Sequence, residues 1–371
     1  MLKIYQKKYK IKYNKSNSCK WMKNSIECNL LGNTKKNGKG EKDMAHGFGE
    51  LISVLKRDPK TIVFTEGTDA RILEASSRLL ASNFLHPILV GNPNDIYDAA
   101  EECGFNIRGA EIIDPDNFDR MDEMVELLCE LRKSKGITPE EARKILKKTN
   151  YFGTMLVKMG IADSLLGGAT YTTADTVRPA LQLIKTKPEN NIVSSCFILV
   201  RPRATGENEV LAMGDCAINV HPSEDDLVEI AYETAKCAKV FGVEPEVAFL
   251  SYSTYNSASG EDVDKMRNAA MKTKKAHPDL IVGGEMQFDA AVSPRVAKAK
   301  CPNDPVGGHA NTFIFPDINA GNIAYKVAQR LGNFQAYGPI LLGLNAPIND
   351  LSRGCNASEV YSMAILTAAL A

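Results

Sequence analysis

From Met44 onward, short runs of β-branched and aliphatic residues alternate with longer amphipathic stretches, and this alternation constrains the fold more than any other feature. The segments 61–65, 87–91 and 110–114 are predicted to be buried strands, each followed by a helix. A repeated strand-helix order implies right-handed crossovers and a mainly parallel sheet that helices cover on both faces. We therefore expect an α/β protein.

The second half of the chain keeps this alternation and adds a predicted antiparallel pair. Segments 192–200 and 209–213, with Pro202 and Gly206 between them, predict a hairpin. Further strands are predicted at 247–252, 280–282, 312–315 and 340–342, and further helices at 223–241, 289–299, 321–331 and from 357. A chain of 371 residues has room for two domains.

The first 43 residues differ in charge from everything that follows. They hold 12 lysines, no arginine and three acidic residues, which gives +9, whereas the whole chain has a net charge of zero. Because residues 1–43 show no sustained periodic pattern of apolar residues, this segment is predicted to be a disordered or artefactual leader. If translation begins at Met44, the native protein lacks it. The chain has no apolar run of 18 residues and no signal peptide, and the remainder is acidic, so we expect neither membrane nor nucleic-acid binding.

The spacing of the cysteines and the absence of common catalytic motifs exclude several classes of enzyme. The nine cysteines form no CxxC pair and have no histidine at metal-ligand spacing, which predicts free thiols, a reducing cytoplasm and no metal. The sequence also lacks GxGxxG after a strand, HExxH and GxSxG. A dinucleotide enzyme, a zinc protease and a serine hydrolase are therefore not indicated.

Four polar loops lie at the ends of predicted strands, where α/β proteins bind ligands. In the first, two glycines precede Thr173 and Arg178 at a predicted helix start, an arrangement that suits an anion. Helix capping by Thr172 and Asp175 accounts for the same spacing. Both interpretations stay open at this point.

The second and third loops are equally ambiguous. Residues 251–262 contain Ser253 and Thr254, whose hydroxyls could line a pocket or belong to a solvated turn. Residues 311–323 place Asn319 just after a buried strand, where it could bind substrate or form part of a turn and cap. We include Ser253, Thr254 and Asn319 among the expected substrate-binding residues.

The fourth loop contains Ser352 and Arg353, which supply a hydroxyl donor and a bidentate partner for phosphate. Glu359 lies three residues after Asn356, and this spacing also predicts a helix capping box. Cys355 has no histidine nearby in sequence, so a buried thiol is favoured over a nucleophile. Together the four loops indicate a site for an anionic small molecule.

These loops closely resemble those of the phosphate acetyltransferase (phosphotransacetylase) family, and the resemblance covers residues 44–371. The stretches that carry it are TTADTVRPALQLIKTKP (172–188), LSYST (250–254), SGEDV (259–263), GGEMQFDAA (283–291), FIFPDINAGNIAYKVAQRLG (313–332) and GPILLGLNAPINDLSRGC (338–355).

The resemblance implies two α/β/α domains with a cleft between them, similar to isocitrate and isopropylmalate dehydrogenases. One domain would be 44–187 plus 339–371, and the inserted second domain would be 188–338. It also implies a homodimer that needs no metal and no cofactor. The partners would be small molecules: CoA, acetyl-CoA, phosphate and acetyl phosphate.

The implied reaction is acetyl-CoA + phosphate = acetyl phosphate + CoA, by direct thiolate attack in a ternary complex. By resemblance, Ser352 would stabilise the oxyanion, Arg353 would hold the phosphoryl group and Glu359 would take the thiol proton. Four more residues match arginines that the family uses, or is thought to use, around CoA or phosphate: Arg71, Arg132, Arg178 and Arg330.

Two positions depart from the family pattern. Glu359 stands where the family usually has Asp, and Tyr171 stands where it often has His, so Tyr171 is not expected to act as an acid or base. Two alternatives therefore remain: a phosphate acyltransferase for a longer chain such as butyryl, and a catalytically weak CoA-binding regulatory protein.

Overall fold

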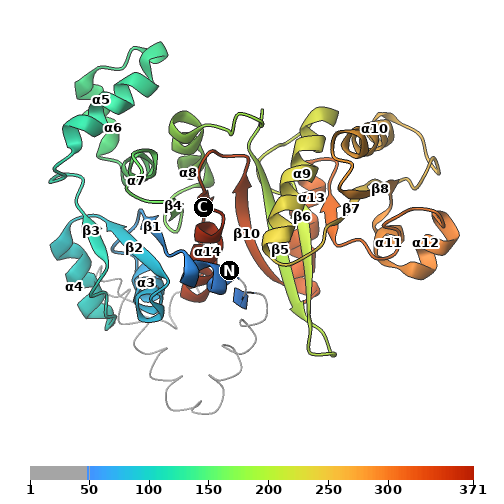
Figure 1. Ribbon diagram of the computed structural model, residues 1–371, viewed down its shortest axis with the longest axis horizontal. Coiled ribbons are helices and arrows are strands. Elements are labelled where there is room, and N and C mark those ends of the chain that lie inside the picture. The colour runs from blue at the N-terminus through green and yellow to red at the C-terminus, as the bar shows by residue number, and fades with distance from the viewer. Residues whose placement is uncertain (1–47, 50) are drawn as a thin grey trace, which may run out of the picture.

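The computed structural model describes residues 48–49 and 51–371, which form two sheets that lie side by side (Figure 1). The predicted leader 1–43 and the predicted start at Met44 lie outside the described residues. Both halves mix strands with covering helices, which confirms the α/β prediction.

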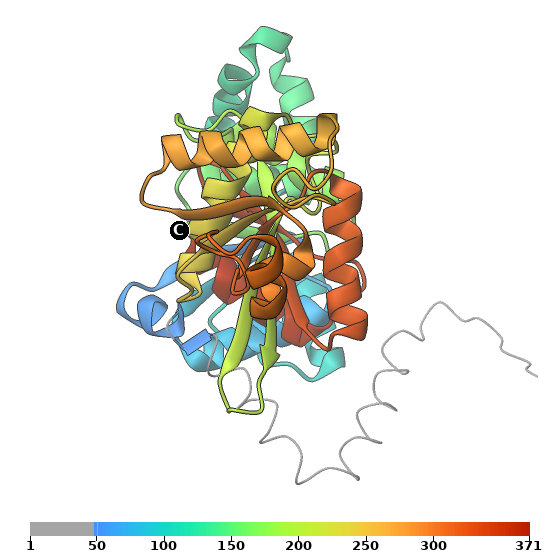
Figure 2. The same ribbon diagram turned by 90° about the vertical axis from the view of Figure 1, so that its right-hand side faces the viewer.

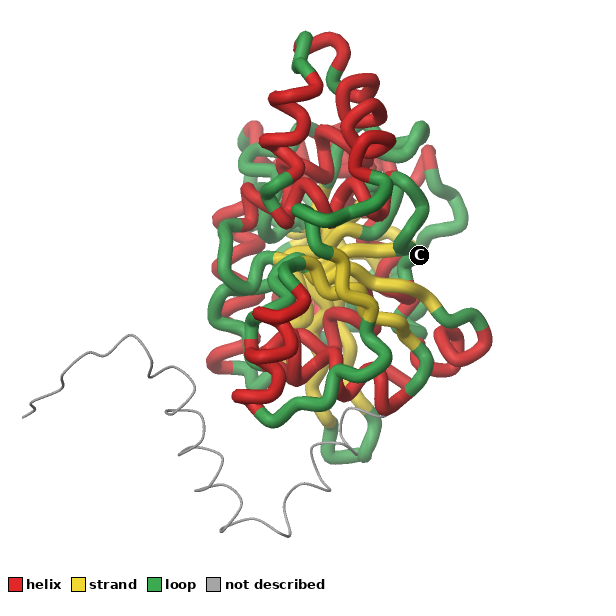
Figure 3. The backbone as a smooth tube through the Cα atoms, turned by 90° about the vertical axis from the view of Figure 1, so that its left-hand side faces the viewer, coloured by secondary structure: helices red, strands yellow, loops and turns green. Residues whose placement is uncertain are grey.

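The first sheet has five strands in the order β11-β4-β1-β2-β3, and every neighbouring pair is parallel. Its strands are β1 (Lys60–Phe64), β2 (Leu85–Val90), β3 (Glu111–Ile113), β4 (Ser164–Gly167) and β11 (Ile348–Asp350). Its helices are α3 (Ala70–Ser82), α4 (Pro93–Cys103), α5 (Met121–Leu131), α6 (Pro139–Leu146), α7 (Thr149–Lys158), α8 (Thr173–Pro179) and α14 (Ala357–Ala369). Helices α5 and α6 project from one end of this half (Figures 1 and 3).

The helix starts follow the local sequence signals. The side chain of Asp69 accepts a hydrogen bond from the backbone of Arg71 at the start of α3. Thr138 and Glu141 form the predicted capping box of α6, because each side chain bonds to the backbone of the other residue. These two predictions are confirmed.

The second sheet has six strands in the order β10-β5-β6-β9-β7-β8. Its strands are β5 (Ser194–Pro202), β6 (Asn208–Gly214), β7 (Glu246–Leu250), β8 (Ile281–Met286), β9 (Thr312–Ile314) and β10 (Gln335–Leu342). Its helices are α9 (Glu224–Val240), α10 (Glu261–Ala276), α11 (Phe288–Val292), α12 (Pro294–Lys300) and α13 (Ile318–Leu331). Strands β5 and β6 form the predicted antiparallel hairpin, which projects at the bottom of Figure 2.

Two strands of the first sheet and most of β10 were not predicted. β4 and β11 are only four and three residues long. β3 and β9 are equally short, but each lies within a longer apolar segment that was predicted as a strand, 110–114 and 312–315. β10 begins at Gln335, five residues before the predicted strand, because the register shifts between Tyr337 and Ile340 and interrupts the pattern.

The two sheets share a packed core around α14. One cluster of buried side chains contains Leu166 of the first sheet, Ile198 and Ile340 of the second, and Val360 of α14. The side chain of Asn349 in β11 accepts a hydrogen bond from the backbone N–H of Leu341 in β10, 2.8 Å away. β10 runs across the predicted boundary between residues 338 and 339, and the division into 44–187 plus 339–371 and 188–338 stays a prediction. None of the described helices is both long and apolar enough to cross a membrane.

Candidate active site

Three loops meet at the carboxyl ends of β1, β4 and β11. The chain builds β1, β2 and β3 outward and then returns to the other side of β1 with β4, so the strand order reverses between β1 and β4. Open α/β sheets bind ligands at such a reversal. The loops at this edge comprise residues 65–69, 168–172 and 351–356.

Arg71 ties the three loops together. Its Nε and Nη2 donate to the Asp69 carboxylate at 2.9 and 2.8 Å, and Nη2 also donates to the carbonyl of Ala169 at 2.8 Å. Its Nη1 donates to the carbonyls of Arg353 and Cys355 at 2.9 and 3.2 Å. Burial opposes ionisation of Asp69, but the hydrogen bonds from Arg71 outweigh it and lower the pKa of that carboxyl. All N–H donors of the Arg71 guanidinium are therefore used by protein acceptors, so Arg71 would have to break one of these hydrogen bonds to contact a substrate.

Glu66 and Tyr171 join the first two loops. Glu66 accepts hydrogen bonds from the backbone N–H of Thr170 at 2.9 Å and from the Thr65 hydroxyl at 3.0 Å. The Thr65 hydroxyl also lies 2.7 Å from the Tyr171 hydroxyl. Burial raises the pKa of Glu66, and burial followed by the nearby Glu66 charge raises the pKa of Tyr171. Tyr171 therefore stays a neutral phenol.

Asp350, the last residue of β11, is buried and bonds to α8. Its carboxylate accepts hydrogen bonds from the hydroxyls of Thr173 and Thr176 at 2.6 and 2.5 Å. The next residue, Leu351, donates its N–H to the carbonyl of Gly167 at 2.7 Å. The Thr173 hydroxyl, predicted to bind substrate, is thus committed to Asp350.

The two glycines of the first loop leave room for these contacts. A Cβ atom at position 167 would lie 2.1 Å from the Tyr171 hydroxyl oxygen. One at position 168, where φ is +96°, would lie 2.2 Å from a carboxylate oxygen of Asp350. Any side chain at either position would displace the polar groups that join the loops.

The loop 351–356 presents Ser352 and Arg353 to solvent. The Ser352 hydroxyl oxygen accepts a weak hydrogen bond from the N–H of Gly354 at 3.3 Å, which leaves its proton available. The Arg353 guanidinium donates no hydrogen bond to any residue that the structure describes. This loop thus presents one hydroxyl and one positive charge to an incoming ligand.

Glu359 forms the capping box that its spacing predicted. Its Oε2 accepts a hydrogen bond from the N–H of Asn356 at 2.9 Å, and its own N–H donates to the Asn356 side chain at 2.9 Å. Oε1 accepts no hydrogen bond from the described part of the chain. The capping and catalytic interpretations are therefore compatible, because each uses a different oxygen.

A cavity of about 270 Å³ opens beside this loop, between the two halves of the molecule. Ser352 and Glu359 line it from the first half, and Arg330 of α13 and Tyr337 of β10 line it from the second. Cys355 also lines the cavity, but burial raises the pKa of its thiol to about 11. The predicted catalytic pair thus shares one space, and the interpretation of Cys355 as a buried thiol is supported.

The two remaining predicted arginines, Arg132 and Arg178, both act on the phenol of Tyr151. Burial raises the pKa of Tyr151, and the charges of Arg178 and Arg132 oppose that rise. Arg178 lies in the last turn of α8, which is only seven residues long, not in the first turn as predicted. Asp175 accepts hydrogen bonds from the N–H and hydroxyl of Thr172, so the capping interpretation of the first loop is also confirmed.

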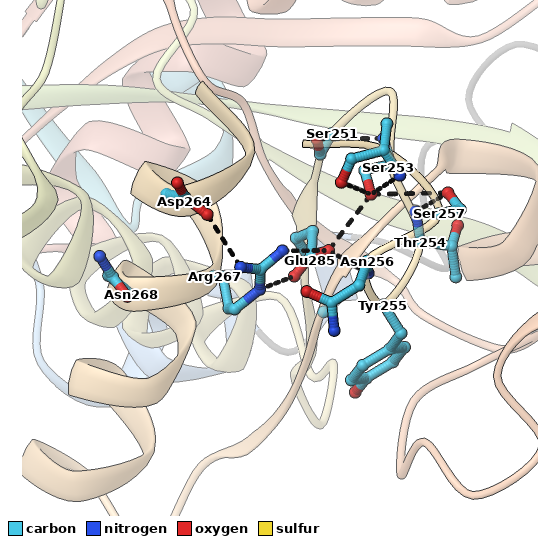
Figure 4. A network of polar contacts seen from close by, with 12 residues as sticks. Ser251, Ser253, Thr254, Tyr255, Asn256, Ser257, Asp264, Arg267, Asn268 and Glu285 are labelled. Carbon is cyan, nitrogen blue, oxygen red and sulfur yellow. Dashed lines mark hydrogen bonds and ion pairs between the residues drawn. The ribbon is translucent and has the colours of Figure 1, made fainter. Parts of the chain in front are cut away.

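The second polar loop belongs to a different network, shown in Figure 4. The Glu285 carboxylate accepts hydrogen bonds from Arg267 at 2.9 and 3.2 Å, from the Asn256 N–H at 2.9 Å and from the Ser253 hydroxyl at 3.3 Å. Thr254 exchanges hydrogen bonds with Gln287. The structure does not bring Ser253 and Thr254 to the cavity that Ser352 lines.

Asn319 also lies away from that cavity. It is exposed in the first turn of α13, whereas Arg330 is in the last turn of the same helix. Eleven residues of helix separate them by about 16 Å. The two expected residues therefore lie at opposite ends of α13, and only Arg330 lines the cavity.

Glu66 and Asp350 are polar residues of this edge that the sequence reasoning missed. Each stands at or just after the end of a buried strand, and such an acid is a usable signal for a hydrogen-bonding hub. In the region 48–49 and 51–371, no group of three or more His, Cys, Asp and Glu side chains could hold a metal ion.

The fold and this edge define an α/β protein with a serine, a carboxylate and unpaired arginines around a cavity between its two halves. A family model described as "Phosphate acetyl/butaryl transferase" matches residues 48–368. The chain belongs to this family and is a transferase.

Similar proteins are phosphate acetyltransferases and phosphotransacetylases. A phosphate acetyltransferase of Bacillus subtilis is 51% identical over 328 residues, which cover 88% of this chain and 100% of the relative. A crystal structure of a phosphotransacetylase from Streptococcus pyogenes is 48% identical, with a TM-score of 0.82 over 87% of this chain and 97% of that one. A phosphotransacetylase from Staphylococcus aureus is 43% identical, with a TM-score of 0.80 over 87% and 98%.

Proposed function

We propose that the chain catalyses acetyl-CoA + phosphate = acetyl phosphate + CoA at the edge formed by β1, β4 and β11. The observation that carries this proposal is that Ser352, Glu359 and Arg330 line one cavity, next to the unpaired guanidinium of Arg353. The relatives named above, at 43% to 51% identity, support the same reaction.

In the direction of acetyl-CoA synthesis, the free oxygen of Glu359 takes the proton of the CoA thiol. The thiolate then attacks the carbonyl carbon of acetyl phosphate, and the Ser352 hydroxyl donates to the oxyanion that forms. The carbon–oxygen bond to phosphate breaks as the tetrahedral intermediate collapses, and Arg353 holds the departing phosphate. Because side chains take the proton, stabilise the oxyanion and hold the phosphate in this scheme, it uses neither a metal nor a cofactor.

Arg132 and Arg178 bind phosphate groups of the substrates in this scheme. The charges of Arg132 and Arg178 both act on Tyr151, and the Arg178 guanidinium donates no hydrogen bond within the described residues. Both arginines are therefore proposed to bind phosphate groups of CoA or phosphate itself. Arg71 acts mainly by holding the loop 351–356, because its donors are all used by protein atoms.

The direct test is phosphate-dependent release of CoA from acetyl-CoA, followed with a thiol reagent. The expected result is turnover by the wild-type protein that disappears when phosphate is omitted. CoA binding without turnover would support the regulatory-protein alternative instead.

The acyl chain accepted depends on the cavity beside Ser352. At about 270 Å³ it is small, and Phe197, Tyr337 and Met363 line it together with the catalytic pair. We expect acetyl-CoA to be preferred over butyryl-CoA because a longer chain must fit against these side chains. Faster turnover of butyryl-CoA under the same conditions would overturn this preference.

We propose a homodimer through one face of α13. Ile323, Val327 and Leu331 recur every four residues and are 62%, 50% and 81% exposed. Val327 also lines a cavity of about 1020 Å³ with Phe288 and Val292 of α11, so the apolar surface continues onto a second helix. Such an exposed apolar patch is typical of a protein interface.

Sedimentation of the wild-type protein and of Val327→Glu tests this interface. The wild type should sediment as a dimer and the variant as a monomer. Met271→Glu is the matched control, since Met271 is 54% exposed on α10, and it should leave the dimer intact. A monomeric wild type would rule out the homodimer.

None of the seven described cysteines forms a disulfide. Together with a reaction that uses CoA, this supports a reducing cytoplasm as the place of action.

A further inference from the structure

Asp350 is a buried carboxylate that the reaction scheme leaves unused. It is 1% exposed, and its partners are the hydroxyls of Thr173 and Thr176 on α8. It ends β11, two residues before Ser352 in sequence, and its neighbour Leu351 is anchored to Gly167 of β4. A buried charge is costly, so a buried carboxylate bound only by hydroxyls requires an explanation.

We propose that Asp350 is a positioning residue that couples Ser352 to the arginine-bearing helix α8. This inference rests on the proposed function, because Ser352 and Arg178 have roles only if the reaction occurs. Nothing in the reaction requires Asp350 to touch a substrate; it acts through the two segments that it joins.

The contacts show how one carboxylate can fix both segments. Thr173 and Thr176 are three residues apart, so they lie on one face of α8, and bonding both to Asp350 fixes the rotation of that helix about its axis. Arg178, two residues further on, points from a different face, so the same rotation sets its direction. The connection from Asp350 to Ser352 is also short, because only Leu351 separates the two residues.

The absence of a Cβ at position 168 supports the same role. That Cβ would lie 2.2 Å from Asp350 Oδ1 and 3.0 Å from the backbone nitrogen of Leu351. The first loop therefore approaches the carboxylate closely enough that α8, β4 and β11 are all in contact with it. Loss of the charge should change the relative placement of Ser352 and Arg178 without opening a cavity.

The first test is Asp350→Asn in the full-length protein, assayed by phosphate-dependent CoA release and by urea unfolding. The amide keeps the shape of the side chain but replaces one acceptor with a donor. Displacing catalytic groups by a fraction of an ångström to one ångström costs up to about 100-fold in rate, so we expect kcat to fall by about 10- to 100-fold and KM for phosphate or CoA to rise. The urea midpoint at neutral pH should not fall, because an unpaired buried charge has been removed.

The second test removes one hydroxyl and keeps Asp350. Thr176→Val should lower kcat and raise KM in the same direction as Asp350→Asn, and Thr176→Ser, which restores the hydroxyl, should recover both. Thr234→Val is the matched control: the Thr234 hydroxyl on α9 is also buried but has no hydrogen-bond partner in the described residues. That control should keep wild-type kcat and KM.

The coupling itself is measured by adding Arg178→Ala to each background. If Asp350 directs Arg178, Arg178→Ala should raise KM less in Asp350→Asn than in the wild type, which is a non-additive pair. Strict additivity, or wild-type kinetics in Asp350→Asn, would overturn the inference. A loss of activity matched by an equal loss of folded protein would also overturn it, since Asp350 would then be purely structural. An inactive wild type would reject the proposed function instead, so the two failures are distinguishable.

Discussion

The loops at 351–356 and 251–260 are both polar and both follow a strand of a mainly parallel sheet, yet their polar groups are used differently. Around Glu285, hydroxyl, backbone and guanidinium donors bond to one another and form a closed network (Figure 4). Around Ser352, the serine proton, one oxygen of Glu359 and the Arg353 guanidinium have no acceptor or donor in the described residues.

A polar loop at the end of a strand is therefore not by itself a site. Ser253 is fully buried and satisfied, whereas Ser352 is exposed beside a cavity. Hydrogen bonds that are already made stabilise a loop, and groups that remain unpaired can bind or react. Substitutions in the two loops should therefore differ in whether they affect kcat or stability.

The largest effect is expected from Ser352→Ala compared with Ser253→Ala. Losing one oxyanion donor costs about 100- to 1000-fold in kcat, so Ser352→Ala should lose that much with little change in stability. Ser253→Ala leaves the half-buried N–H of Ala258 without its acceptor and should cost about 1–3 kcal/mol of unfolding free energy, with kcat almost unchanged. Steady-state kinetics and urea unfolding measure both. A large fall in kcat for Ser253→Ala would contradict the distinction between a reactive Ser352 and a structural Ser253.

Glu359→Gln isolates catalysis from helix capping. Glutamine can serve at the third position of a capping box, so the start of α14 should persist while the base is lost. We expect kcat to fall by about 100-fold or more and the urea midpoint to stay near that of the wild type. Wild-type turnover in this variant would remove Glu359 from the mechanism and leave it as a cap only.

A smaller effect is expected when the unpaired arginine is compared with the paired one. Arg178→Ala should raise KM by about 10- to 100-fold, the loss expected for one charged hydrogen bond to substrate. Arg267→Ala should instead lower the free energy of unfolding, because it leaves the buried Glu285 carboxylate without its ion pair, and should leave KM unchanged. Steady-state kinetics and urea unfolding measure both variants, and a raised KM in Arg267→Ala would show that Arg267 also contacts substrate.

The smallest effect concerns the pH dependence of stability. Burial raises the pKa of Asp350, although the hydrogen bonds from Thr173 and Thr176 oppose the rise. An acid with a raised pKa in the folded state binds its proton more tightly there, so the wild type should lose stability relative to Asp350→Asn as the pH rises from about 4 through the raised pKa. Urea midpoints of both proteins at several pH values measure this slope. A difference that grows in favour of the wild type with rising pH would contradict it.

Much of the fold follows from local sequence signals. The strands at 60–64, 85–90 and 194–202 and the helix caps at Asp69 and Thr138 were predictable because each is long enough, or chemically specific enough, to be read from its own residues. The Ser352–Glu359 pair was predicted through the family resemblance, and both residues line one cavity.

The remaining features depend on contacts between distant segments. Strand β11 has three residues, and nothing within them shows that they pair with β4. The commitment of Thr173 to Asp350 spans 177 positions, so no local pattern reveals that this hydroxyl is already used. The equally polar loop at 251–260 could not be separated from a substrate pocket without knowing that Glu285 and Arg267 lie beside it.

The place of β11 in the chain also sets an order of assembly. Thr176 and Asp350 are 174 positions apart, and every strand of the second sheet is synthesised between them. A nascent chain could therefore complete β1 to β4, and then the second sheet, while the proposed catalytic edge still lacked one strand. Insertion of β11 beside β4 brings the carbonyls of Arg353 and Cys355 to Arg71 and closes that edge. The enzyme should consequently gain its activity in a single late event, after most of its tertiary structure is formed.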